Sequence, residues 1–502
     1  MKKTKENIIF AADVLLSFTA AFVIIFICSK SSPLYPLNDW VDANTYHTLG
    51  RGMLHGKVPY RDLYEQKGPL LYLLHALAAA ISGNSFFGVF IIEAAAAGAF
   101  LLITARMLRK EGRTALLWLV PLIGTAVYSS KAFCHGDSAE ELCLPLTLAA
   151  YLFGRQAAMD GKPLTDRQRF VSGVLAACVL WIKYTFLGVF MAAFAADMIV
   201  TVRKKDVMSA IRGAALYVLG AAAASAAVLA YFAVNGAVDD VFSVYFYDNI
   251  FRYPSEGSFF HHLADGWNFS RIFMTVPFCI ICAALVLMPV KHGVRGAVWY
   301  AGSVLVMSLT VFGGHDSYQY YPLAMAVFLP EAVCVLCECA APLFEKLKLP
   351  ERAIPFVAAA SIVLSGGLCY KLSRNLYLMK YDRDELPQYK FAEIMEERGG
   401  GSVLNYGFID GGFYLAAEQV PEFRYFCLNN MEIPEMVSAQ EHYVSSGRAH
   451  FVVARSETPD QPEYFTGYDL ISTAELSYYD KYLYYFLFEI NESNKNFDLA
   501  IE

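Results

Sequence analysis

Charged side chains are scarce in this chain of 502 residues. Asp, Glu, Lys and Arg make up 17% of it, below the roughly 25% of an average soluble protein, while apolar residues make up 56%. This composition excludes a disordered protein and a coiled-coil or collagen-like rod. It also disfavours a soluble globular enzyme. We therefore expect an α-helical polytopic membrane protein with a soluble appendage.

Acidic residues, which are scarce in most of the chain, are concentrated near the C-terminus. From 374 to 502 there are 10 Lys and Arg against 22 Asp and Glu, a net charge of −12, whereas 1–373 carries 30 and 25, a net charge of +5. We therefore predict a transmembrane domain, 1–373, and a small C-terminal domain, 374–502. The acidic tail argues against a nucleic-acid partner, because phosphates bind to basic surfaces.

The sequence also lacks a disulfide or metal framework. Most of the 11 cysteines lie in or beside apolar segments, where a thiol packs as a small hydrophobic group. The tail contains only Cys427, and the Cys279-x-x-Cys282 pair has no second pair to complete a metal site. No metal ligand is assigned and no cofactor is certain, although a divalent metal remains open.

Long apolar runs fill most of the first 373 residues. A helix needs about 20 such residues to cross roughly 30 Å of hydrocarbon. The first run follows three lysines and has no cleavage pattern, which indicates an uncleaved anchor. Eleven transmembrane helices are expected, at 8–28, 86–106, 114–131, 141–158, 171–183, 185–202, 210–234, 269–289, 296–313, 320–340 and 353–372.

Every second loop between these spans is rich in Lys and Arg. Basic loops stay on the cytoplasmic side, so the pattern predicts a multi-pass protein of the cell membrane with a cytoplasmic N-terminus and an extracytoplasmic tail. Two extracytoplasmic loops are long. The first, 29–84, contains an apolar segment, 69–81, which is too short to span and suits an interfacial helix, and the second, 236–267, is rich in aromatic residues.

The tail alternates helical and strand patterns, which is typical of a small α/β domain. Helices are expected at 385–398 and 434–446. Strands are expected at 402–406, 450–454, 469–472 and 482–489.

Two features of the first outer loop suggest chemistry. Asp42 follows the first span closely, where a short helix would hold its carboxylate near the membrane surface. Lys67 precedes Gly68-Pro69, where the chain turns into the apolar segment. A lysine at this position can meet a lipid phosphate as a point charge, and the proline suits the start of a helix.

At these residues the chain resembles the GT-C-fold membrane glycosyltransferases of the dolichyl-phosphate-mannose protein mannosyltransferase and aminoarabinose transferase type (the bacterial family-39-like enzymes). Such enzymes have a catalytic Asp just after the first span, then a Pro-Tyr-x-Asp stretch and a Lys-Gly/Pro-Pro-Leu motif. Asp42, Pro59-Tyr60-Arg61-Asp62 and Lys67-Gly68-Pro69-Leu70 match them. The resemblance covers nearly the whole membrane body. Further matches are Asp137, Glu140, Glu141, Lys183, Asn249, Tyr253, Tyr318, Tyr320 and Tyr321.

The resemblance implies a mannosyltransferase-like reaction. A sugar would move from a polyprenyl-phosphate donor to an extracytoplasmic glycan, lipid or protein acceptor by a single inverting displacement. The catalytic base is Asp42 or Asp39, with Asp42 favoured, because the Asp-Glu pair of some relatives is absent here. Glu140 and Glu141 would assist it. The implied binding residues for donor phosphate and sugar are Asp39, Tyr60, Arg61, Lys67, Asp137, Lys183, Asn249, Tyr253, His315, Tyr318 and Tyr321.

Each assignment has a structural alternative. Acids such as Asp42 could cap helices, and lysines such as Lys67 could extend to lipid head groups. The alternative functions are a lipid-linked sugar transporter or flippase, a polysaccharide polymerase or ligase, and an inactive scaffold. A transporter would need ionisable residues deep in its spans, where we find Glu93 and Asp197. A nucleotide-sugar donor is disfavoured, because no Gly-rich loop follows a strand.

Overall fold

A computed structural model describes residues 2–204, 206–253, 255–344, 350, 353–431, 433–461, 465–479 and 481–491. The chain forms two compact units, each described here by itself. The first unit comprises Met1–Ser29, Phe90–Ala230 and Ser255–Arg374. The second comprises Lys30–Val89, Tyr231–Pro254 and Asn375–Glu502, so it joins the first outer loop, the aromatic loop and the tail.

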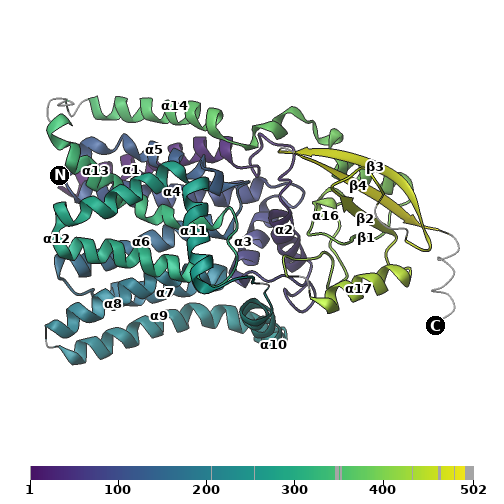
Figure 1. Cartoon of the computed structure of the whole chain (residues 1–502), viewed down its shortest axis with the longest axis horizontal. Helices are drawn as coiled ribbons and strands as arrows, with labels where there is room; N and C mark the ends of the chain where they lie inside the picture. Colours follow the sequence, from purple (N-terminus) through teal and green to yellow (C-terminus); the bar gives the residue numbers. More distant parts are fainter. Residues whose placement is uncertain are drawn as a thin grey trace. The chain divides into compact units, whose positions relative to one another are not determined.

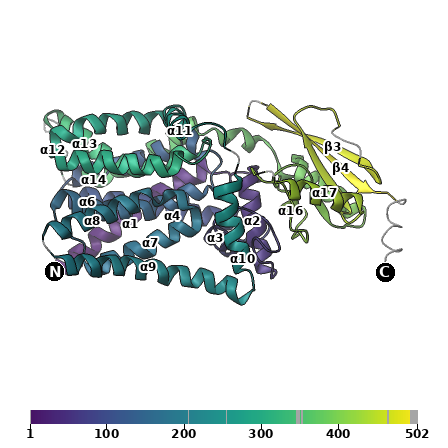
Figure 2. The ribbon, with the colours of Figure 1, turned by 60° about the horizontal axis from the view of Figure 1, so that its bottom comes forward.

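The first unit is a bundle of helices within its described residues. Its long helices run roughly parallel to one another (Figures 1 and 2). In chain order the helices of this unit are α1 (Lys2–Cys28), α4 (Phe87–Lys110), α5 (Leu119–Tyr128), α6 (Ala139–Asp160), α7 (Asp166–Lys183), α8 (Gly188–Arg203), α9 (Val207–Val234), α11 (Phe259–Phe273), which crosses the others in Figure 1, α12 (Thr275–Phe312), α13 (Leu329–Phe344) and α14 (Ile354–Leu372).

Seven helical stretches of the described chain are long and apolar enough to cross a membrane. Two of them contain two helices each: Asp166–Arg203 holds α7 and α8, and α12 is kinked at Gly293. With α5, which has 10 residues, and α6, which carries four charged residues, each of the eleven predicted spans corresponds to a helical segment. The predicted boundary at 269 is wrong, because the backbone leaves the helical conformation at Met274, between α11 and α12.

The first outer loop contributes two short helices to the second unit. α2 (Val41–Leu54) and α3 (Pro69–Ile81) pack closely on each other. Gly50 permits this close approach, because any side chain at that position would collide with the backbone of His75. α3 coincides with the apolar segment predicted at 69–81. Its location at a membrane interface remains a prediction.

Much of the aromatic segment 236–267 is helical, although we expected a loop. α10 (Val238–Val241) continues into a π-helix, η4 (Phe242–Arg252), and α11 begins at Phe259. The π-helix is two-sided. Tyr245 and Asp248 are buried on one side, while Tyr247 and Phe251 are exposed on the other.

The tail forms a four-stranded sheet in the order β1-β2-β4-β3. Its strands are β1 (Val403–Asn405), β2 (Phe451–Ser456), β3 (Tyr468–Tyr478) and β4 (Lys481–Ile490). β1 runs parallel to β2, with Leu404 opposite Val452, and the other two pairs are antiparallel. These apolar side chains form the core with Phe486, Phe488 and Val444, which comes from α17 (Pro434–Ser445).

The element types predicted for the tail are confirmed. α15 (Pro387–Glu397), α17 and the four strands fall in the predicted regions. β3 is longer than the predicted 469–472, because the strand resumes after a bulge between Leu470 and Ser472. Its polar residues lie at the edge of the sheet, where exposed polar side chains discourage pairing with other chains.

Candidate active site

Asp42 lies in the first turn of α2, where the helix dipole favours an acid. Its carboxylate is buried, with 6% of the residue exposed, and Oδ2 accepts a hydrogen bond of 3.3 Å from Tyr46 Oη. The Tyr46 ring in turn lies 6.0 Å from Lys67 Nζ. We name Asp42, Tyr46 and Lys67 the acid–lysine cluster. In it, the acid contacts the hydroxyl group of the tyrosine and the cation faces its ring.

Lys67 is held where the loop enters α3. Its backbone N–H donates to Glu65 Oε2 at 2.7 Å, and its Nζ lies 4.0 Å from Glu65 Oε1. Tyr72 also donates to this carboxylate. Gly68-Pro69 then starts the helix, so local sequence fixes the position of the lysine.

Tyr60 supports the loop that precedes Lys67. It is fully buried with a φ of 70°, its N–H donates to Leu63 O at 2.7 Å, and its Oη donates to Lys67 O at 2.6 Å. Burial raises the pKa of this phenol well above its usual value, so Tyr60 stays protonated as a donor. Tyr60 thus holds the backbone of the loop at Lys67.

Arg61 and Asn249 join the same loop to other parts of the second unit. The Arg61 guanidinium hydrogen-bonds Asp62, which lowers the pKa of that carboxyl, and donates to Asn235 O at 2.6 Å. Asn249, on the π-helix, donates to Gln66 O at 2.6 Å. Tyr253, also among the predicted residues, is half-buried and immediately follows the π-helix.

Asp39 is tied into a buried ion pair. Lys30 Nζ lies 2.5 Å from Asp39 Oδ1, and Tyr377 Oη donates to Asp39 Oδ2 at 2.6 Å. The Lys30 ammonium also lies 4.6 Å from the Tyr377 ring centroid. Both carboxylate oxygens of Asp39 thus have hydrogen-bond partners.

The first unit holds a second cluster of predicted residues. Lys183, at the end of α7, forms a buried ion pair with Glu140 in the first turn of α6. Its ammonium lies 4.0 Å from the ring centroid of Tyr321 and 5.4 Å from that of Tyr320. Tyr318 stacks on Tyr320 with a centroid distance of 5.7 Å. The pair therefore has an aromatic wall, which is suited to a sugar or a lipid phosphate.

A strained turn before α6 carries Asp137. Cys134, Gly136 and Asp137 all have positive φ angles, which side-chain-bearing residues adopt rarely. Glu93 holds this turn: Oε1 accepts from the Asp137 N–H at 2.8 Å, and the carboxylate accepts from Ser29 Oγ at 2.8 and 2.9 Å. The Asp137 N–H also lies 3.3 Å from Glu141 Oε1. Strain of this kind tends to occur at functional sites.

The two acids placed within spans have structural partners. Glu93 holds the turn just described. Asp197 accepts from the Arg169 guanidinium at 2.8 Å and from the Leu164 N–H at 2.7 Å. Each acid is thus hydrogen-bonded to other segments of the first unit.

His315 precedes Asp316, whose carboxylate lies 3.3 Å from His262 Nδ1. Among the described residues, no three His, Cys, Asp or Glu side chains come together as metal ligands.

The predicted site residues thus divide between the two units. Asp39, Asp42, Tyr60, Arg61, Lys67, Asn249 and Tyr253 belong to the second unit, and Asp137, Glu140, Glu141, Lys183, His315, Tyr318 and Tyr321 belong to the first. Sequence reasoning missed Tyr46, Lys30 and Tyr377. Tyr46 lies one turn after Asp42, a spacing that could have revealed it.

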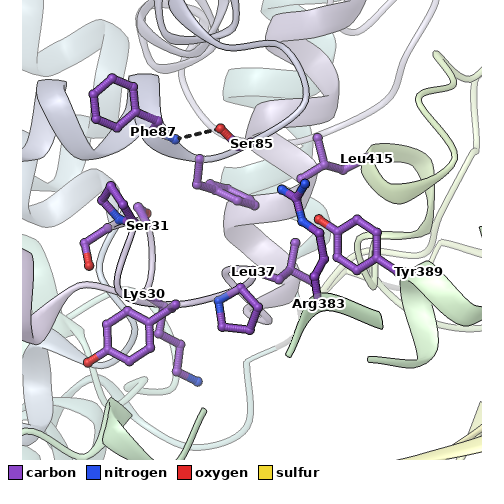
Figure 3. A pocket seen from close by; sticks show the side chains of 13 residues that line it. Lys30, Ser31, Leu37, Ser85, Phe87, Arg383, Tyr389 and Leu415 are labelled. Carbon is purple, nitrogen blue, oxygen red and sulfur yellow. Dashed lines mark hydrogen bonds between the residues drawn. The ribbon is translucent and has the colours of Figure 1, made fainter. Parts of the chain in front are cut away.

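The second unit also contains a cavity of about 510 Å³. Lys30, Ser31, Leu37, Ser85, Arg383, Tyr389 and Leu415 are among its lining residues (Figure 3). The segment 30–37 thus faces the cavity and leads directly to Asp39 and α2.

No protein family matches this sequence, and no curated protein does. Solved structures that are similar to the chain include two of ArnT from Cupriavidus metallidurans. The structure bound to undecaprenyl phosphate has 12% sequence identity and a TM-score of 0.52, with 96% of this chain and 98% of that chain covered. The apo structure has 12% identity and a TM-score of 0.53, with 91% and 93% covered. The predicted fold class is confirmed: the chain has the GT-C fold with a small C-terminal α/β domain.

Proposed function

We propose that this chain is an integral-membrane glycosyltransferase that moves a sugar from a polyprenyl-phosphate donor to an extracytoplasmic acceptor. The acid–lysine cluster is the observation that carries the proposal. Its context supports the same chemistry, because the cluster occurs in a chain with the fold of ArnT, which has been crystallised with undecaprenyl phosphate.

Asp42 is the proposed catalytic base. Only 6% of the residue is exposed, and Tyr46 donates a hydrogen bond that orients its carboxylate. Asp39 is the weaker candidate, because Lys30 and Tyr377 already bind its two oxygens. A base must lie within hydrogen-bond reach of the acceptor hydroxyl, and a carboxylate on a rigid helix can be held in that position.

The lysines are the proposed phosphate contacts. A polyprenyl phosphate leaves as an anion, so positive charge stabilises its departure more than a proton donor would. Lys67 provides this charge in the second unit. In the first unit we assign the same role to Lys183, with Glu140 and Glu141 assisting and with Tyr318 and Tyr321 as contacts for the sugar.

The proposed reaction is a single displacement. The acceptor oxygen attacks the anomeric carbon while the bond from that carbon to the phosphate oxygen breaks, and its electron pair leaves with the phosphate. The hydroxyl proton passes to the Asp42 carboxylate and then to water. Attack opposite the leaving group inverts the configuration of the anomeric carbon.

The proposal includes an orientation. The N-terminus would lie in the cytoplasm, and the C-terminal domain, 374–502, would lie outside it and help to choose the acceptor. The acceptor is a glycan, a lipid or a protein.

A transfer assay on the purified chain in lipid nanodiscs tests the proposal. We would offer a panel of radiolabelled polyprenyl-phosphate sugars, with a membrane extract as the source of acceptor. Asp42→Asn is the test variant and Asp239→Asn, an exposed acid of α10, is its matched control. We expect transfer to fall about 10²- to 10⁴-fold in Asp42→Asn alone, the contribution of a positioned base.

Donor binding is measured on the same samples. We expect Asp42→Asn to bind the donor as wild type does. Equal transfer by Asp42→Asn and wild type would contradict the assignment of the base. A wild-type protein that binds no polyprenyl-phosphate sugar would overturn the proposal as a whole.

A further inference from the structure

The cavity of the second unit is built from three parts of the chain (Figure 3). Segment 30–37 forms one wall, residues 85–87 at the start of α4 form another, and Arg383, Tyr389 and Leu415 of the tail close it. Its volume of about 510 Å³ lies within the roughly 300–1,000 Å³ of small-molecule sites.

The two cations that line the cavity, Lys30 and Arg383, differ in their interaction partners. Lys30 is neutralised by Asp39 at 2.5 Å and hydrogen-bonds Tyr377 at 2.6 Å. Arg383 is exposed, and no carboxylate of the described residues pairs with it. Its guanidinium lies 4.8 Å from the ring centroid of Tyr389 and 3.5 Å from the carbonyl oxygen of Asn84. Arg383 is therefore an exposed cation beside an aromatic ring, and it forms no ion pair within the described residues although Asp382, Asp384 and Glu385 flank it in the sequence.

The remaining lining combines rings with hydroxyl groups. Tyr35, Tyr389, Phe86 and Phe87 supply aromatic surface. Ser31, Ser32 and Ser85 supply hydroxyl groups. A sugar ring has apolar C–H faces and a rim of hydroxyl groups, so aromatic faces beside polar groups complement it.

We infer that this cavity binds the acceptor, and that the acceptor is a carbohydrate with a phosphate or carboxylate group that Arg383 recognises. The inference rests on the proposed function and names its acceptor class. The position of segment 30–37 in the sequence supports assigning the cavity to the acceptor rather than to the donor. Segment 30–37 leads into Asp39 and then into the first turn of α2, which carries the base Asp42.

Binding of sugar phosphates to the full-length protein in zwitterionic nanodiscs tests this inference. The probes are glucose 6-phosphate, glucose and inorganic phosphate, measured by calorimetry. Arg383→Gln removes the cation, and Ser85→Trp fills the cavity from its edge. Lys390→Gln removes an exposed charge nearby on α15 and serves as the matched control. Thermal unfolding of each variant checks that it is folded.

We expect saturable binding of glucose 6-phosphate by wild type and Lys390→Gln. Arg383→Gln should weaken it about tenfold, the effect of losing one charge-assisted hydrogen bond. Ser85→Trp should abolish it. Glucose and inorganic phosphate should each bind more weakly than glucose 6-phosphate, because each lacks one half of the ligand.

Unchanged affinity in Arg383→Gln would overturn the inference, as would the absence of saturable binding to wild type. Inorganic phosphate that binds as tightly as glucose 6-phosphate would also overturn it, because the sugar would then contribute nothing. Repeating the titration in nanodiscs with an anionic phosphorylated glycolipid identifies the source of the ligand. Competition supports a glycolipid head group, and no competition supports a soluble glycan.

The donor-binding assay separates this inference from the proposed function. A wild-type protein that binds sugar phosphate but no polyprenyl-phosphate sugar would contradict the transferase and leave the cavity as a carbohydrate site. Donor binding without any sugar-phosphate binding would contradict only the cavity assignment.

Discussion

The carboxylate of Asp42 accepts a hydrogen bond of 3.3 Å from the hydroxyl group of Tyr46, one turn further along α2. This bond orients a buried acid from within its own helix. It also joins the acid to Lys67, whose ammonium lies 6.0 Å from the same tyrosine ring. Base and cation are thus organised around one aromatic side chain.

Tyr46→Phe should lower the rate of transfer and leave the affinity for the donor unchanged. The ring that faces Lys67 stays, but the hydrogen bond to the Asp42 carboxylate is lost, so kcat should fall about tenfold. Tyr231→Phe, at a half-buried tyrosine of the same unit, is the control. A change in donor KM with kcat intact would instead assign Tyr46 to donor binding.

Lys67→Gln should weaken donor binding. Removing the ammonium that meets the phosphate should raise the donor Kd about tenfold or more, and Lys67→Arg should restore part of the loss. Titration with polyprenyl phosphate, which carries no sugar, measures the phosphate contact alone. Lys57→Gln removes a charge from the same loop without the tyrosine contact. Equal affinities in both glutamine variants would contradict a phosphate role for Lys67.

The buried pair of Lys183 and Glu140 should show strong coupling in a double-mutant cycle. Lys183→Met alone leaves a buried carboxylate without its cation, which costs about 3–5 kcal/mol. Adding Glu140→Leu should recover much of that loss of stability, measured by thermal unfolding in nanodiscs. Transfer activity should stay low in the double variant, because its stability is restored but its cation is not. Additive losses of stability would show that the pair is not formed.

Protein stability should fall as the pH is lowered through the range set by His47. Burial lowers the pKa of this imidazole from 6.5 to about 3, so the folded protein holds it neutral. Below pH 6.5 the unfolded chain binds a proton at this histidine, whereas the folded chain does not. The free energy of unfolding therefore decreases progressively as the pH falls to about 3. One such group contributes a slope of about 1.4 kcal/mol per pH unit.

His47→Phe should flatten that slope between pH 6.5 and 4.5, because the new ring packs against Phe86, which already lies 5.0 Å from the imidazole centroid. His442→Phe, at an exposed histidine of α17, should leave the slope unchanged. Unfolding by denaturant at several pH values provides the measurement. Parallel slopes for His47→Phe and wild type would show that His47 is protonated in the folded state.

Local signals made parts of the site predictable from sequence. Pro69 and the apolar run after it mark the start of α3, and this fixes where Lys67 lies. The distance of Asp42 from the first span predicted a short helix, which is α2. The elements of the tail were predictable because it alternates helical and strand patterns and because glycines follow its first helix.

Long-range contacts were not predictable in the same way. Lys183 and Glu140 are 43 residues apart in the sequence, and Tyr377 reaches Asp39 across 338 residues. No periodicity encodes such a pairing. The π-helix was also missed, because its widened turns break the 3.6-residue spacing by which a helix is recognised.

The anomeric configuration of the product tests the central claim most directly. Wild-type protein would be incubated with a polyprenyl-phosphate sugar of known configuration, and the transferred sugar would be analysed by NMR together with the released carrier. The account predicts one polyprenyl phosphate released for each sugar transferred, with inversion at the anomeric carbon. Transfer with retention would contradict the single displacement at Asp42, and a donor that is bound but never consumed would contradict the transferase.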